Sequence, residues 1–519
     1  MKLTDRVINP AVQKSNAEAL AKAGVVLPKF SELADPLGID PNIQRELQRV
    51  DFDEPHPLNL FRVHWHNTRR ERAFARVPEH VVLPPSLTGV DAKIVVLLGN
   101  RFPMIRAHKV LAAYACLAPR IVSGEFDLTK HRAVWPSTGN YCRGGVAVSR
   151  IVGCRGVAVL PAGMSAERFR WLEAWAKPED IVRTPGTESN VKEIYDACAR
   201  LERDPANVIF NQFAEYANYL VHNRCTGPAV GRVFSALNSR VIPSEARNPL
   251  LAGEGDSSPS SRLGMTQDLR LRAFVSATGS AGTIAAGDHL KDVYGSATVA
   301  VEALECPTLL YNGFGEHRIQ GIGDKHVPLI HNAMATDMVA AVSDRAVDAL
   351  NVVFNTDAGR KLLATRYGVD AATIEALASF GGSSICNVIA AIKVAKYHRM
   401  TSSDVVATIA TDGAEMYASE VEKTLHARYF GAFDVVDAAA AFGEYILGAT
   451  TDNLVELTRR ERERIFNLGY FTWVEQQGIP AEEFAARASE SFWRDLQRFV
   501  PAWDAMIEEV NAEAGVVAV

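Results

Sequence analysis

The order of apolar and polar positions along the chain predicts strands that alternate with helices. The apolar, β-branched run at 92–100 closes with Gly99-Asn100 and predicts a buried strand, and mostly apolar helix formers over 108–118 predict the helix after it. Similar patterns predict further strands at 133–135, 156–163, 180–183, 206–210, 271–276, 298–302 and 405–410, with helices starting at Gly144 and covering 165–176. The alternation favours an α/β fold, a parallel sheet covered by helices on both faces.

Three regions do not follow this alternation. The first 85 residues are rich in Pro, Asp, His and Arg and are predicted to form a partly helical extension. Residues 430–519 carry apolar positions at helical spacing, which predicts a helical extension or a dimer surface. Residues 239–267 are dense in Ser, Pro, Gly and Arg and are predicted to be a neutral, disordered insert.

Composition narrows the class of protein. Hydrophobic residues make up 48% and charged residues 22% of the 519 positions, as in folded globular proteins that need more than one domain at this length. The formal charge of −6 argues against nucleic acid or an anionic membrane as partner. No secretory signal or membrane span is expected, and seven scattered cysteines without a CxxC pair predict a cytoplasmic protein.

A small-residue turn at 277–283 is the strongest local chemical signal. The sequence Ala-Thr-Gly-Ser-Ala-Gly-Thr follows a predicted strand and precedes a predicted helix. Small residues let an anion approach the backbone, and amides at a helix N-terminus bind it, so phosphate is the natural ligand. Many strand–helix turns are rich in glycine for steric reasons alone, so the turn by itself leaves both readings open.

Two further segments carry candidate chemistry. The turn Pro136-Ser137-Thr138-Gly139-Asn140-Tyr141 offers hydroxyls and amides that suit a carboxylate, or that cap the following helix. Lys109 follows Ile105 and precedes Val110 and Leu111; a lysine desolvated by such neighbours forms Schiff bases readily. A lone lysine at a helix start is more often a surface residue.

Taken in order with 317–323 and 381–384, these segments resemble the fold-type II pyridoxal-phosphate enzymes, and most closely the cysteine synthase and cystathionine β-synthase branch. The family's lysine motif is matched by Ala107-His108-Lys109 and its asparagine loop by Thr138-Gly139-Asn140. Its phosphate loop, Gly-Thr-Gly-Gly-Thr, is similar to residues 279–283. The resemblance covers roughly 92–417 without the insert.

The resemblance implies an architecture and an assembly. Two parallel-sheet αβα domains of the tryptophan synthase β-like fold are expected, with a helical C-terminal extension and a homodimer. The implied divisions are an N-terminal extension at 1–85, a large cofactor domain at 86–127 and 239–429, a small mobile substrate domain at 128–238, and the extension at 430–519.

The resemblance also implies residue roles. Lys109 would bind pyridoxal 5'-phosphate as an internal aldimine and then move the Cα proton, and Asn140 would hydrogen-bond the ring hydroxyl. The phosphate would be held by Gly279, Ser280, Ala281, Gly282 and Thr283. The carboxylate of an amino-acid substrate would be held by Ser137, Thr138, Gly139, Tyr141 and Gln212.

The implied reaction is β-elimination or β-replacement on a 3-substituted L-amino acid through an aminoacrylate, which makes the chain a lyase or transferase similar to cysteine synthase. Four positions at three places depart from the family pattern. Val110-Leu111 replace Asp-Arg, Tyr141 replaces a threonine, and Gly413 replaces the serine that contacts the pyridine nitrogen, leaving that contact to water or Thr411.

Two alternatives stay open. Gly413 and the insert suit a non-catalytic relative that keeps the fold as a binding or regulatory module. In the second alternative, residues 279–283 bind a dinucleotide in a nucleotide-binding α/β protein. This alternative lacks support from a GxGxxG turn with a paired acidic residue. No metal is expected, because His64 and His66 lack a third ligand at a suitable spacing.

Overall fold

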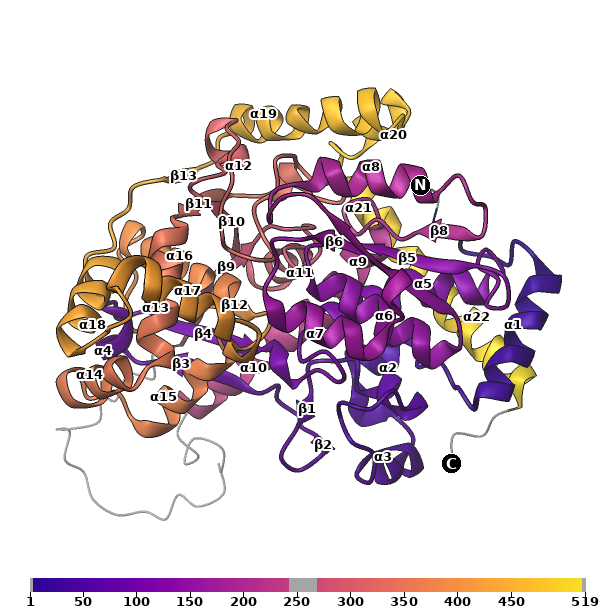
Figure 1. The fold of residues 1–519 in the computed structure, drawn as a ribbon, viewed down its shortest axis with the longest axis horizontal. Helices are drawn as coiled ribbons and strands as arrows, with labels where there is room; N and C mark the ends of the chain where they lie inside the picture. The colour runs from indigo at the N-terminus through magenta and orange to yellow at the C-terminus, as the bar shows by residue number, and fades with distance from the viewer. Residues whose placement is uncertain (1–2, 242–267, 516–519) are drawn as a thin grey trace, which may run out of the picture.

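The computed structural model describes residues 3–241 and 268–515. Its main strands form a large sheet and a small sheet (Figure 1). Most of the predicted insert, 242–267, lies outside the described residues. The seven-stranded sheet has the order β13-β11-β10-β9-β12-β4-β3 and the four-stranded sheet the order β7-β6-β5-β8; β1 (Asn67–Thr68) and β2 (Ala73–Phe74) form a separate pair. The strands of the large sheet are β3 (His80–Leu83), β4 (Lys93–Leu98), β9 (Arg270–Ala277), β10 (Ala297–Ala303), β11 (Met338–Val342), β12 (Asp404–Ala410) and β13 (Leu454–Glu456).

The small sheet is entirely parallel, whereas the large sheet is parallel only in its centre. Its two edge strands, β3 and β13, run antiparallel to β4 and β11. The strands of the small sheet are β5 (Arg132–Pro136), β6 (Arg155–Pro161), β7 (Ile181–Thr184) and β8 (Asn207–Ile209). Each strand predicted between 92 and 410 is therefore present within a few residues, and the α/β class is confirmed.

Both faces of the large sheet are buried, as the apolar runs predict. Ile94 and Val96 of β4 pack on one side, and Val95 on the other. One face is covered by α13 (Asp344–Asn355), α14 (Asp357–Tyr367), α16 (Gly382–Tyr397) and α18 (Val435–Phe442). The other is covered by α5 (Lys109–Val122), α9 (Tyr216–Val221), α10 (Gly227–Val241) and α11 (Ala285–Tyr294).

The small sheet is covered in the same manner. Val134 and Val159 pack against α8 (Val191–Leu201), while Trp135 faces α6 (Asn140–Val152) and α7 (Ala166–Trp175). The short helices α4 (Pro85–Thr88), α12 (Thr308–Tyr311), α15 (Ala371–Ala376) and α17 (Ala418–Tyr429) complete the connections.

The helix predicted from Gly144 begins earlier, at Asn140. The prediction was wrong because Gly144 and Gly145 serve close packing and do not start the helix. A Cβ on Gly144 would lie 2.9 Å from the Val110 Cα atom of α5, and one on Gly145 would lie 2.0 Å from the Trp135 ring. Gly139, at φ 142°, makes the turn that precedes the helix.

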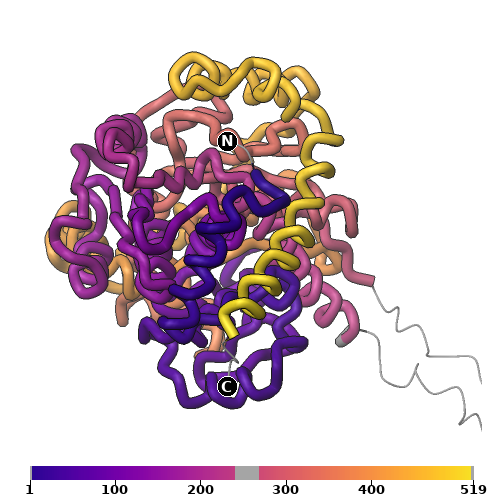
Figure 2. The backbone as a smooth tube through the Cα atoms, turned by 90° about the vertical axis from the view of Figure 1, so that its right-hand side faces the viewer, coloured from indigo at the N-terminus to yellow at the C-terminus, as the bar shows by residue number. Residues whose placement is uncertain are grey.

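The two terminal regions lie side by side (Figure 2). The N-terminal helices are α1 (Pro10–Ala23), α2 (Phe30–Ala34) and α3 (Pro41–Leu47); the C-terminal ones are α19 (Arg459–Tyr470), α20 (Ala481–Ala486), α21 (Glu490–Asp495) and α22 (Phe499–Ala514). Helix α22 packs against α1, α2 and α5. The C-terminal region is helical except for β13, and the expectation of helices alone missed that strand because a three-residue edge strand leaves no apolar period.

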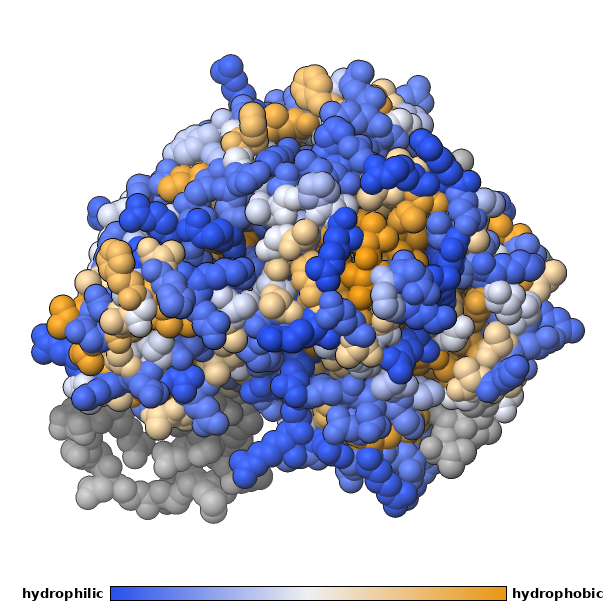
Figure 3. All heavy atoms as spheres, in the orientation of Figure 1, coloured by the Kyte–Doolittle hydropathy of each residue, from blue (hydrophilic) through white to orange (hydrophobic). Residues whose placement is uncertain are grey.

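The surface is mixed in character. On the face drawn in Figure 3, hydrophobic side chains form patches interrupted by hydrophilic ones. Among residues 3–241 and 268–515, no helix has the length and apolar content needed to cross a bilayer.

Candidate active site

One pocket collects nearly all the residues singled out in the sequence. It lies where the carboxyl ends of β5, β9 and β12 meet the first turns of α5 and α16, the edge at which α/β proteins bind ligands. Of the predicted site residues, only Gly139 does not line it; those that do are Lys109, Ser137, Thr138, Asn140, Tyr141, Gln212, Gly279, Ser280, Ala281, Gly282 and Thr283.

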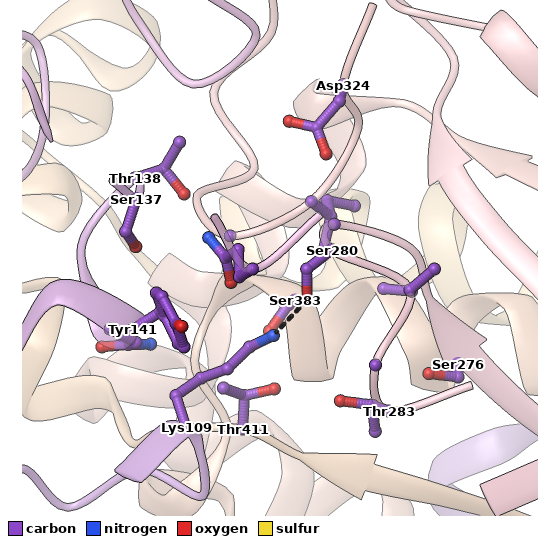
Figure 4. Close-up of a pocket in the computed structure, with 18 of the residues that line it drawn as sticks. Lys109, Ser137, Thr138, Tyr141, Ser276, Ser280, Thr283, Asp324, Ser383 and Thr411 are labelled. Carbon is purple, nitrogen blue, oxygen red and sulfur yellow. Dashed lines mark hydrogen bonds between the residues drawn. The ribbon is translucent and has the colours of Figure 1, made fainter. Parts of the chain in front are cut away.

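Lys109 is the first residue of α5 and extends into the pocket (Figure 4). Its Nζ donates to the Ser280 Oγ atom at 3.1 Å, although the two residues are 171 positions apart. Burial lowers the pKa of Lys109 to about 8, partly offset by the carboxylate of Asp324. A lysine of such pKa holds a substantial neutral fraction near neutral pH and is a competent amine nucleophile.

Residues 279–283 form a tight cradle before α11. A Cβ on Gly279 would lie 2.4 Å from the Gly321 carbonyl oxygen, and one on Gly282 would lie 2.1 Å from Asn218 Oδ1, so both positions need glycine. Ala281 takes a positive φ of 61°. These small residues bring backbone amides to the N-terminus of α11, the arrangement that binds a phosphate.

A buried histidine supports this cradle from behind. His108 Nε2 lies 2.9 Å from the Thr283 hydroxyl, and its ring stacks on Trp65 at a centroid distance of 5.4 Å. Burial lowers the pKa of His108 well below its usual value, so the ring is neutral. His108 therefore fixes the orientation of Thr283 without adding a charge.

Asn140 begins α6 and has both polar side-chain atoms engaged by the protein. Its Nδ2 donates to Asp412 Oδ2 at 2.7 Å, and its Oδ1 accepts from Arg143 Nη1 at 2.9 Å. Its expected contact with a cofactor hydroxyl would thus add to, or replace, one of these bonds. The side chain is held at a fixed place on the pocket wall.

The predicted carboxylate site has a hydroxyl side and an aromatic side. Ser137 and Thr138 follow β5, and the Ser137 Oγ atom accepts from the Gly139 backbone amide at 3.0 Å. Tyr141 packs edge-on against Trp135, and its hydroxyl lies beside the Cys116 thiol of α5. The substitution of threonine by tyrosine therefore fills space toward α5.

The pocket also contains Ser276, Asp324 and Asn387, which the motifs did not identify, together with Ser383 of the 381–384 motif and Thr411. Asn387 accepts from the Ala277 amide at 2.7 Å and donates to the Ile409 carbonyl at 3.0 Å, which ties β9 to β12. Thr411 lines the pocket, whereas Gly413 does not. Asp324 directly follows the 317–323 motif, which was the available signal for it.

A group of buried charges lies next to Asn140. Arg168 of α7 and Asp412 are 1% and 0% exposed in their side chains and approach to 3.3 Å, and the Tyr417 hydroxyl lies 3.1 Å from Asp412 Oδ1. These contacts join a helix of the small sheet to the end of a strand of the large sheet. They fix how the two halves of the pocket meet.

The comparisons with known proteins find relatives by sequence and by fold. No protein-family model matches the chain. It is 27% identical over 286 residues to a probable cysteine synthase of Bacillus subtilis, covering 55% of this chain and 75% of that protein. It is 27% identical over 213 residues to a cysteine synthase of Staphylococcus aureus, covering 41% of this chain but only 57% of that one. In structure it resembles a cysteine synthase of Entamoeba histolytica, with a TM-score of 0.51 and 17% identity over 70% of this chain and 92% of that chain.

The chain has the fold of the fold-type II pyridoxal-phosphate enzymes and is similar in sequence to cysteine synthases. The resemblance drawn from the motifs is confirmed, and so is the cofactor that it implied. The residues of the pocket fit that cofactor, because the enzyme presents a lysine of lowered pKa beside a cradle that added Cβ atoms would fill. The individual roles of the pocket residues stay predictions.

Proposed function

We propose that the enzyme catalyses β-elimination or β-replacement on a 3-substituted L-amino acid, with Lys109 carrying pyridoxal phosphate. The observation that carries the proposal is the contact between Lys109 Nζ and Ser280 Oγ at 3.1 Å, which places an amine beside an anion cradle in one pocket. The names of the relatives, cysteine synthases, support this reaction class.

The cofactor would be held from three sides. Residues 279–283 would bind its phosphate, Asn140 would contact its ring, and Thr411 or Ser383 would replace the side chain that Gly413 lacks. When bound, pyridoxal phosphate supplies an electron sink that stabilises negative charge at Cα. The residues of the pocket orient the substrate and so determine which bond at Cα breaks.

The substrate is held by its carboxylate. Ser137, Thr138 and Gln212 offer hydroxyl and amide donors on the wall opposite the cradle. The neutral amine of Lys109 would take the proton from Cα, because its lowered pKa makes the free amine available near neutral pH. Tyr141 narrows the carboxylate site on the side of α5.

Replacement of Lys109 tests the proposal. Purified wild-type enzyme is expected to show the visible absorbance of protein-bound pyridoxal phosphate, and this band should change when L-serine, O-acetyl-L-serine, L-cysteine, L-threonine or L-diaminopropionate is added. Lys109→Ala should lose both the band and turnover. Lys130→Ala, whose side chain is 75% exposed, is the matched control and should keep them.

Two outcomes would contradict the proposal. Full activity of Lys109→Ala would remove the lysine from the chemistry. A wild-type band that no amino acid alters would favour the alternative of a binding or regulatory relative. The amino acid that produces the largest change identifies the group that leaves Cβ.

We further propose that the enzyme is a cytoplasmic homodimer with the domain division implied by the family. All seven cysteines are free and buried, which suits a reducing compartment. Light scattering of the purified enzyme tests the dimer, since a mass close to 56.5 kDa would mean a monomer. Cell fractionation tests the location.

A further inference from the structure

Asp324 is a buried carboxylate of the pocket that the proposed chemistry has not used. Only 7% of the residue is exposed, and Oδ2 has no hydrogen-bond partner in the part of the chain that the structure describes. In Figure 4 the carboxylate lies on the far side of Ser280 from Lys109. A buried carboxylate oxygen without a hydrogen-bond partner lowers the free energy of unfolding, so its presence in the pocket points to a ligand.

The backbone holds Asp324 firmly in this position. Its carbonyl accepts from the Thr308 hydroxyl at 2.8 Å, and the preceding residue, Gly323, donates its amide to the Thr278 carbonyl at 2.9 Å. Gly323 has a φ of 75°, the region that favours glycine. The side chain is therefore fixed by its neighbours while its oxygen stays free to meet a substrate.

The charges around Asp324 suit proton transfer. Burial raises the pKa of Asp324 to about 7, and the charge of Lys109 opposes this rise. The other titratable groups that it influences are Glu188, Tyr195 and Cys306. Both protonation states are thus populated near neutral pH, the condition under which a carboxyl group works as an acid and as a base.

We propose that Asp324 is a second catalytic residue, the acid that protonates the group leaving Cβ. This inference rests on the proposed function. As the bond between Cβ and the leaving atom breaks, its electron pair goes to that atom, which takes the proton of the Asp324 carboxyl group. In replacement, a neutral nucleophile forms the new bond to Cβ and returns its proton to the Asp324 carboxylate.

The proposal defines a class of substrate. Hydroxide, and to a lesser degree hydrosulfide, leave more readily when protonated, so Asp324 assists L-serine and L-cysteine. Chloride needs none, so the same residue is dispensable for β-chloro-L-alanine. A carboxylate at this place also favours neutral nucleophiles with an O–H, N–H or S–H bond over anionic ones, because like charges repel.

The test compares leaving groups in the holoenzyme. Asp324→Asn keeps the shape of the side chain and removes its titratable proton. We expect keto-acid formation from L-serine and L-cysteine to fall by about 100- to 10,000-fold, the usual contribution of a general acid. The rate with β-chloro-L-alanine should stay close to that of wild type. Asp288→Asn, at a half-buried carboxylate outside this pocket, should change neither rate.

A binding measurement without turnover completes the test. L-Alanine has no group to lose from Cβ, so its spectral titration should be the same in Asp324→Asn and wild type. Equal losses on all substrates, or no loss on L-serine and L-cysteine, would overturn the assignment of Asp324. A wild-type enzyme that turns over β-chloro-L-alanine but neither L-serine nor L-cysteine would overturn it too. A wild-type enzyme that reacts with no amino acid would instead overturn the proposed function.

Discussion

At the scale of single residues, the site depends on how burial changes the pKa of Lys109. Lys109 is desolvated among apolar neighbours, and this burial lowers its pKa, while Asp324 raises it. The groups that face it include the neutral histidines His108 and His222 and the thiol of Cys116. The balance leaves an amine that is available at a pH where an exposed lysine is protonated.

This balance predicts a pH dependence for cofactor attachment. The neutral amine is the reacting form, so the rate at which cofactor-free enzyme captures pyridoxal phosphate should rise with pH and level off above about 8. In Asp324→Asn the midpoint should move to lower pH, because the carboxylate that favours the charged amine is gone. Stopped-flow absorbance measures the pH profile of cofactor capture in the wild type and in the variant. A wild-type midpoint near the pKa of an exposed lysine would contradict the claim that burial lowers the pKa of Lys109.

A second prediction concerns the cradle. Gly282→Ala would place a Cβ 2.1 Å from Asn218 Oδ1, so the loop must shift away from the phosphate. We expect the dissociation constant for pyridoxal phosphate to rise by roughly tenfold or more, equivalent to about 1.4 kcal/mol. Gly443→Ala, where no atom lies within 4 Å, is the control and should bind as wild type. Equal affinity in the two variants would argue against a close phosphate contact.

At the scale of elements, Arg168 connects the two sheets. It lies on α7 and donates to the Ser165 hydroxyl at 2.8 Å and the Tyr417 hydroxyl at 3.0 Å, beside Asp412. Removing one member of a buried ion pair leaves the other charge uncompensated, which costs far more than the loss of a surface pair.

The expected result is a large loss of stability in Arg168→Ala. The free energy of unfolding in urea should fall by about 3–5 kcal/mol. Arg170→Ala lies on the same helix with a side chain 69% exposed, and its pair with Glu167 should contribute less than about 1 kcal/mol. Similar small losses in both variants would mean that Arg168 is not needed to join α7 to β12.

At the scale of the whole molecule, the two ends of the chain stabilise each other. Asp504 of α22 accepts from the backbone amides of Phe30 at 2.6 Å and Ser31 at 3.0 Å, and so caps α2 from a distant part of the sequence. Asn511 pairs with both backbone groups of Leu27. Helix α22 therefore helps to hold the N-terminal region in place.

Loss of this cap should be measurable. Asp504→Ala is expected to lower the free energy of unfolding by about 0.5–2 kcal/mol, the usual effect of removing a helix cap. Glu508→Ala, on the same helix and 74% exposed at 4.0 Å from Lys29, should cost less than about 0.5 kcal/mol. Equal values in urea unfolding would show that α22 does not cap α2.

The amino-acid sequence by itself determined the strand–helix alternation, the α/β class and the order of the loops that carry Lys109, Asn140 and residues 279–283. These features are local, because apolar period and turn residues act over a few positions. Sequence patterns did not identify β11 or the antiparallel edge strands β3 and β13, since the partner of a strand lies outside its local pattern.

Only the tertiary structure decided which residues meet. Asn140 bonds to Asp412 across 272 positions, and Gly144 and Gly145 of α6 let α5 and Trp135 approach closely. Asp324 belongs to no motif, because its importance comes from an unpaired oxygen in the same pocket as Lys109. Long-range packing sets burial and charge at a site, and no local pattern contains that information.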